Sequence, residues 1–190
     1  MEKPVLIQAL RRLGELAEAE GSMVEITVYG GVAMMLHFDS RQATKDIDAI
    51  FRPRAETLAL ARKVQAELDL PDNWINDEVR QFLSNELAAR EAGLRVTPFA
   101  LPPELREAPG VRISAASPRY LVAMKARALR RPLPGITGDR EDLAVLFRHE
   151  NIRSADEVDE ILEEFFPDYI LDERARLVIE AIIEKAHAAS

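Results

Sequence analysis

"YGGVAMMLHFDSRQATKDIDAIF", residues 29–51, joins two β-strand patterns through a glycine pair, an apolar segment and a polar loop. Upstream, residues 24–28 alternate apolar and polar side chains, as a half-buried strand does. The apolar segment predicts a short helix over about 32–37, and the second strand is predicted over 46–51, where Pro53 ends it. The stretch therefore predicts a strand–helix–loop–strand unit at the centre of the fold.

The flanking sequence supplies further helices and strands. Ser117 before a proline, and Ser154 with Glu157, are typical of helix N-termini. Residues 74–87 indicate a loop followed by a helix. Apolar spacing predicts helices over 4–20, 55–68, 117–130, 140–149, 154–166 and 170–187, and strands over 93–99 and 111–115. We therefore predict an α+β fold with a mixed sheet flanked by helices, divided into a core over 1–116 and a helical region over 117–190 packed on that core.

The composition excludes several classes of site. The chain has 190 residues, 47% of them hydrophobic and 31% charged, and it has no cysteine, which leaves no disulfide or thiolate metal site. A hard metal held by carboxylates remains open. The net charge of −8 argues against nucleic-acid binding by overall charge, although residues 117–131 hold five basic residues and no acid. No apolar run approaches the roughly 18 residues of a membrane span, so we expect a cytoplasmic protein with no membrane partner.

Asp46 and Asp48 are the residues that call most clearly for a ligand. Alternate residues of a strand point to the same face, with their Cα atoms about 6.5–7 Å apart. Two neighbouring carboxylates need a cation or a polar surrounding, and Mg²⁺ accepts one or two carboxylates together with substrate phosphates. Gly30 and Gly31 end the preceding strand before a helix, where backbone N–H groups favour a phosphate. If the two strands are neighbours, both halves of a phosphate–metal site lie together.

The sequence GGVAMML followed by R-x-x-T-x-D-I-D resembles the signature of the nucleotidyltransferase superfamily of the DNA polymerase β type. Within it, the chain looks most like the AbiEii-like nucleotidyltransferases of toxin–antitoxin systems and their uncharacterised relatives. The resemblance covers roughly residues 5–150 and is strongest in residues 29–51. It implies a nucleotidyltransferase-like sheet, with Mg²⁺ as cofactor and a nucleoside triphosphate (NTP) as substrate.

The resemblance also implies roles for individual residues. Gly30 and Gly31 look like the phosphate-binding turn, and Arg41 and Thr44 look like phosphate or nucleotide contacts. Asp46 and Asp48 look like the metal ligands. A later lysine and acid are matched by Lys125, which would hold triphosphate charge, and by Asp142, or alternatively Asp139, which would act near the nucleophile.

These roles imply an enzyme that transfers a nucleoside monophosphate from an NTP to a hydroxyl acceptor. The acceptor is a tRNA, a protein or a small molecule, and the resemblance adds a role as a toxin with a cognate antitoxin. The alternative is a catalytically inactive nucleotide-binding or protein-interaction module that acts as a regulator.

Two departures from the superfamily pattern bear on that alternative. The superfamily usually has Gly-Ser where this chain has Gly30-Gly31, which removes one hydroxyl contact. Many members carry a third carboxylate on a later strand, whereas residues 93–99 contain none. Asp77 or Glu78 could substitute from a loop, or one metal ion alone could bind tightly.

Overall fold

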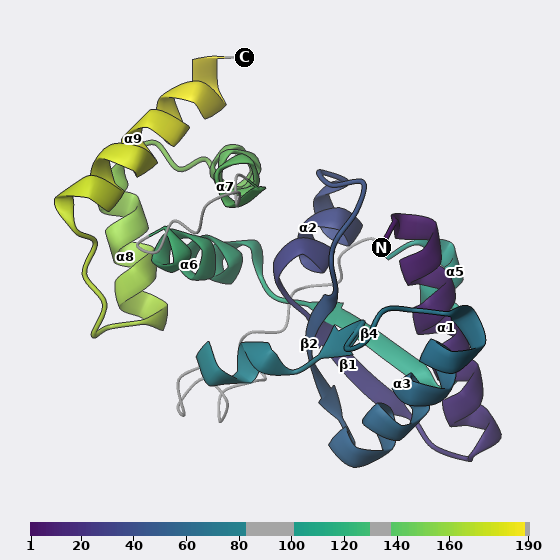
Figure 1. Cartoon of the computed structure of the whole chain (residues 1–190). Coiled ribbons are helices and arrows are strands. Elements are labelled where there is room, and N and C mark those ends of the chain that lie inside the picture. The colour runs from purple at the N-terminus through teal and green to yellow at the C-terminus, as the bar shows by residue number, and fades with distance from the viewer. Residues whose placement is uncertain (83–100, 130–137, 189–190) are drawn as a thin grey trace. The chain divides into compact units, whose positions relative to one another are not determined.

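The computed structural model describes residues 1–82, 101–129 and 138–188, and it separates into two compact units, Met1–Ala116 and Ser117–Ser190 (Figure 1). The first unit contains all four strands of the described residues, and the second contains helices. The division falls where the sequence pattern changes from mixed elements to helices alone.

The first unit is built on the strand–helix–loop–strand stretch. Helix α2 (Gly30–Phe38) connects β1 (Val24–Val28) to the loop before β2 (Ile47–Arg52). The remaining elements are helices α1 (Lys3–Ala19), α3 (Arg54–Leu68) and α5 (Pro103–Arg106), the 3₁₀ helix η1 (Glu78–Phe82), and strands β3 (Ile75–Asn76) and β4 (Val111–Ala115).

The four strands form one mixed sheet in the order β3-β2-β1-β4. Strand β1 is antiparallel to β2 and parallel to β4, and β3 is parallel to β2. The predicted α+β fold with a mixed sheet flanked by helices is confirmed. Because β1 and β2 are hydrogen-bonded neighbours, the strand ends that carry Gly30 and Asp48 lie at the same place in the sheet.

The two faces of the sheet differ in polarity. On one face, Ile26 pairs in register with Phe51 and Ile113, and all three side chains are buried. On the other face, the Thr27 hydroxyl lies 3.0 Å from the Ser114 hydroxyl. Thr27 pairs in register with Ile50, and Asp48 lies two residues before Ile50. Because strand side chains alternate between the two faces, Asp48 belongs to this second, polar face.

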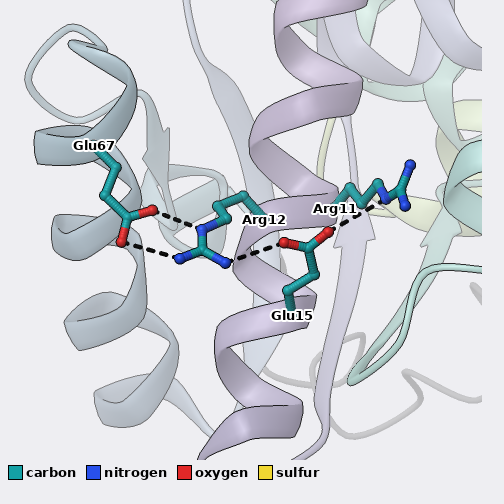
Figure 2. Close-up of polar contacts among 4 residues, drawn as sticks. All are labelled: Arg11, Arg12, Glu15 and Glu67. Carbon is teal, nitrogen blue, oxygen red and sulfur yellow. Dashed lines mark hydrogen bonds and ion pairs between the residues drawn. The ribbon is translucent and has the colours of Figure 1, made fainter.

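Helices α1 and α3 pack beside each other, and α1 also contacts β4 and α5. Arg12 of α1 joins the two helices: its Nε donates to Glu67 of α3 at 2.6 Å, and its Nη1 donates to Glu15 at 3.1 Å (Figure 2). The hydrogen bond to Glu67, followed by that to Glu15, raises the pKa of the Arg12 guanidinium above its ordinary value. The ion pair of Arg12 with Glu67 therefore links α3 to α1 at the surface.

The second unit consists of α6 (Pro118–Ala128), α7 (Gly138–His149), α8 (Ala155–Phe165) and α9 (Glu173–Ala188). The predicted cap at Ser117 is confirmed, because its hydroxyl accepts the Tyr120 N–H at 3.1 Å. The capping box of α8 is confirmed as well, with the Ser154 hydroxyl accepting from the Glu157 N–H at 3.3 Å. Helix α6 packs on α7 and α8, and α7 packs on α9.

Residues 74–82 depart from the sequence prediction. Where a loop was expected, Ile75–Asn76 form the short strand β3, and the helix that follows begins as the 3₁₀ helix η1; residues 83–87 of the prediction lie outside the described residues. Two residues are too few to show an alternating pattern, and β3 forms because it pairs with β2. The strand predicted over 93–99 lies outside the described residues. None of the helices in the described part of the chain combines the length and apolarity that a bilayer crossing requires.

Candidate functional site

The glycine turn connects β1 to α2. Tyr29 is extended, and its N–H donates to the Asp48 carbonyl at 2.9 Å, which ties the turn to β2. Gly30 has a φ of +53°, in the left-handed region that favours glycine, and α2 begins at this residue. The first N–H groups of a helix have no acceptor within the helix, so the turn presents backbone donors next to β2.

The space beside each glycine is limited by a different predicted site residue. A Cβ on Gly30 would lie 3.2 Å from the Asp48 Oδ2. A Cβ on Gly31 would lie 2.9 Å from the Thr44 Oγ1 and 3.3 Å from the Arg41 Nη1. The fold thus brings the glycine turn, one aspartate, the threonine and the arginine to one place, although ten or more residues of chain separate the turn from the rest.

The same geometry bears on the missing serine at the turn. Any side chain at residue 31 would meet the Thr44 hydroxyl, which already occupies that space. Thr44 also donates from its Oγ1 to the Asp46 carbonyl at 3.1 Å, so its hydroxyl is held in position. A hydroxyl is therefore present beside Gly31, but the loop supplies it.

Asp46 was predicted to start the second strand, but it lies in the bend one residue before β2. Its Oδ2 accepts a 3.3 Å hydrogen bond from the Asn76 Nδ2, and Asn76 is the register partner of Asp48. Paired residues of neighbouring strands project to the same face of a sheet. Asp46 and Asp48 therefore both lie around Asn76, on the polar face.

Asn76 is the residue of this cluster that was not among the predicted site residues. Its side chain is 9% exposed, and its orientation is fixed because the Oδ1 accepts the Glu78 N–H at 3.0 Å while the Nδ2 faces Asp46. The amide thus presents a donor to the carboxylate. A two-residue strand gives no sequence pattern that would have marked this position.

The carboxylates of Asp77 and Glu78, which the sequence offered as substitutes for a third metal ligand, are not part of this cluster. Asp77 is bound through both oxygens by Arg54, at 2.5 and 3.1 Å, and this hydrogen bonding holds the pKa of the Asp77 carboxyl below its usual range. Glu78 is exposed at the start of η1. In the ranges that the structure describes, no three acids, histidines or cysteines gather closely enough to form a metal cage.

The donor set nevertheless fits a hard divalent cation that is shared with a substrate. Two carboxylates and a neighbouring hydroxyl are oxygen donors of the kind that Mg²⁺ prefers, and Mg²⁺ commonly takes its other ligands from water and phosphate. The backbone donors at Gly30 would meet such a phosphate. Asp46 and Asp48 are the residues that would hold the ion.

The later predicted residues form a cluster of their own in the second unit. The Lys125 Nζ lies 2.6 Å from the Asp142 Oδ2 and 2.9 Å from the Asp139 Oδ1. The side chains of Lys125 and Asp142 are 7% and 2% exposed, whereas that of Asp139 is 29% exposed. Of the two acids, Asp139 is the more accessible, and the pair of Lys125 and Asp142 joins α6 to α7.

The other basic residues of the 117–131 stretch that the structure describes also have partners. Arg119 pairs with Glu164 at 2.7 Å, and the Arg127 guanidinium lies 4.8 Å from the centre of the Phe166 ring. These contacts engage the cations within the helical unit. The pair with Glu164 offsets the charge of Arg119, which leaves less positive charge for an RNA backbone.

No family model, curated protein or solved structure matches this chain. We call one cluster the carboxylate–glycine site; it consists of the glycine turn with Arg41, Thr44, Asp46, Asp48 and Asn76. Its functional interpretation therefore rests on the chain's own residues.

Gly31→Ala should weaken the NTP binding that the resemblance implies, with little loss of fold stability. The new methyl group pushes the Thr44 hydroxyl and the Arg41 guanidinium out of place, because both lie within 3.3 Å of it. We expect about a tenfold increase in the Kd for an NTP with Mg²⁺, measured by calorimetry. Gly21→Ala, at a glycine with open space around it, is the control, although its φ of +69° makes it the less stable variant. Unchanged NTP affinity in Gly31→Ala would separate the turn from nucleotide binding.

Proposed function

We propose that the protein is a Mg²⁺-dependent nucleotidyltransferase, which transfers a nucleoside monophosphate from an NTP to a hydroxyl acceptor and releases pyrophosphate. The observation that carries this proposal is the approach of the glycine turn to the second strand: the Asp48 carboxylate lies beside Gly30, and Thr44 and Arg41 lie beside Gly31. A turn built for close backbone approach, two acids and a cation in one place are the parts that phosphoryl transfer requires.

Each residue of the carboxylate–glycine site has a role under this proposal. The backbone N–H groups at Gly30 and Gly31 hold phosphate oxygens, and Arg41 neutralises a further phosphate charge. Asp46 and Asp48 hold Mg²⁺, which supplies charge neutralisation and polarisation at the phosphate undergoing attack. Asn76 keeps the Asp46 carboxylate oriented through its amide donor. Lys125 and Asp142 are proposed to serve triphosphate binding and the acceptor hydroxyl, as the resemblance implies.

A second candidate function is a nucleotide-binding module without turnover, which acts as a regulator or a protein-interaction partner. Two observations favour it. The strand next to Asp48 carries the amide Asn76 rather than an acid, and Lys125 is already neutralised by two carboxylates in its own unit. Such a module keeps the phosphate and metal contacts but does not activate an acceptor.

The test is incubation of the full chain with Mg²⁺ and each of the four α-labelled NTPs in turn. Each incubation is run in three arms: with a tRNA pool, with a protein pool, and with no added acceptor. We expect label in one macromolecular fraction, dependent on Mg²⁺ and lost on chelation. Calorimetric titration of the same NTPs runs in parallel. Transfer supports the enzyme, Mg²⁺-dependent binding without transfer supports the regulator, and absence of both overturns the two proposals together. The tRNA and protein arms also distinguish the classes of acceptor, and identification of a cognate antitoxin requires a separate inhibition assay.

A further inference from the structure

A groove of about 610 Å³ lies in the second unit between α7 and α9, within one compact body. Its lining residues on α9 begin at Arg174 and recur through Leu177, Val178 and Ala181 to Lys185, the three- and four-residue spacing of one helical stripe. This stripe spans roughly 16 Å at the helical rise of 1.5 Å per residue. The groove is therefore as long as about three turns of an added helix.

The floor of the groove is apolar and open. Leu177 is 67% exposed, which is unusual for a leucine of a helix that already buries another face through Ile179 and Ile183. Val145 of α7 and Ile182 of α9 continue the floor. Helix α9 thus has two apolar stripes, one packed within the unit and one that lines the groove. An apolar strip of this length favours burial against another apolar surface.

The rim of the groove is strongly basic. Four cationic side chains line the groove, and the only acidic residue among its described lining residues is Glu141. The cations are Arg140, Arg148, Arg174 and Lys185. The whole chain, by contrast, has a net charge of −8. Arg148 reaches across to the Ala186 carbonyl at 3.5 Å. Among the described residues, the side chains of Arg140, Arg174 and Lys185 make no hydrogen bond or ion pair. Other exposed cations of the described residues are paired, as Lys63 and Arg112 are.

We propose that this groove binds an amphipathic helix of a partner protein, whose apolar stripe packs on the floor and whose flanking acidic residues pair with the rim. The concave, apolar floor fits a helix placed between α7 and α9, as in a helix-in-groove complex. The uncompensated cations select for acidic flanks and speed association. Phosphates of a nucleic acid would leave the floor uncovered, which makes a protein partner the better fit.

A second copy of the chain fits the groove less well. The most acidic helix of the described residues is α8, but its apolar residues Val158, Ile161 and Leu162 are buried within its own unit. It therefore offers charge without an exposed apolar stripe. The proposal does not depend on the nucleotidyltransferase activity, because the groove and the carboxylate–glycine site belong to different units.

The test is selection of the full chain against a displayed library of helical peptides, about 18 residues long, with a fixed Leu/Ala stripe and flanking positions that are acidic, neutral or basic. We expect enrichment of acidic flanks and affinities that fall as salt rises. Leu177→Glu and Arg174→Glu/Lys185→Glu should each weaken the selected peptides by about tenfold or more. The charge-matched control Arg62→Glu/Arg106→Glu changes exposed cations of the first unit and should leave affinity nearly unchanged.

Several outcomes would overturn the proposal. Enrichment of neutral or basic flanks, or binding that Leu177→Glu leaves intact, removes the acidic helix as the occupant. A concentration-dependent dimer that Leu177→Glu dissociates in sedimentation velocity would assign the groove to a second copy instead. Circular dichroism of each variant confirms folding, and because Leu177 is exposed the substitution leaves the packed stripe of α9 in place.

Discussion

Asp48→Asn should abolish nucleotidyl transfer while the chain stays folded. Asparagine keeps the size of the side chain beside Gly30 but removes the charge that a divalent cation requires. Loss of a metal ligand of this kind costs several kcal/mol of transition-state stabilisation, which corresponds to a rate decrease of roughly 10³-fold or more. The measurement is transfer of label from the preferred NTP under saturating Mg²⁺, together with the Kd for that NTP. Asp39→Asn, an exposed carboxylate at the other end of α2, is the matched control and should keep full activity.

Asn76→Asp provides a readout of the metal that does not depend on turnover. The new carboxylate would face Asp46, whose Oδ2 now accepts the Asn76 amide hydrogen at 3.3 Å. Repulsion between the two acids should lower the Tm without divalent cation, and Mg²⁺ should restore it because a third carboxylate strengthens the site. A Tm that Mg²⁺ leaves unchanged in this variant would exclude Asp46 as a metal ligand.

For the Asp48→Asn variant, retained transfer of label would independently exclude the proposed chemistry.

Lys125→Met should destabilise the helical unit by about 3–5 kcal/mol. The substitution removes the ammonium group that lies 2.6 Å from the Asp142 carboxylate, which is 2% exposed, and breaking a buried ion pair by removing one partner is strongly destabilising. The free energy of unfolding is measured by urea denaturation followed by circular dichroism. Arg119→Met, which breaks an exposed pair with Glu164, is the control and should cost about 1 kcal/mol or less.

The double variant Lys125→Met/Asp142→Leu separates the structural role of this pair from the proposed role in nucleotide binding. Removing both charges together should recover most of the lost stability, because hydrophobic residues of similar size replace a buried ion pair at little cost. If Lys125 also holds triphosphate charge, this stable variant still binds an NTP more weakly than the native chain. Full NTP affinity in the double variant would restrict Lys125 to its structural role.

Much of the carboxylate–glycine site followed from sequence patterns, because its parts lie within one strand–helix–loop–strand stretch. Alternation over 24–28, the glycine pair and the two aspartates each depend on local geometry, so they placed the turn and put Asp48 on the second strand. Asp46 lies in the bend one residue before that strand instead of on it. Asn76 did not follow, because a strand of two residues has no period and exists by pairing with β2. The ion pairs of Arg54 with Asp77 and of Lys125 with Asp142 join residues 23 and 17 positions apart, a separation at which no local pattern operates.

The sequence by itself determined most of the long helices and strands, the caps at Ser117 and Ser154, and the change to helices after residue 116, because backbone preferences and apolar periodicity act over a few residues. It did not determine the short elements β3, η1 and α5. The tertiary structure alone decided the order of the strands, the approach of Asp48 to Gly30, and the burial of Lys125 between two acids. It also decided that the second apolar stripe of α9 forms the floor of a groove with a basic rim. These features depend on which surfaces pack together, and packing is set by the shapes and charges of side chains that are distant in the chain.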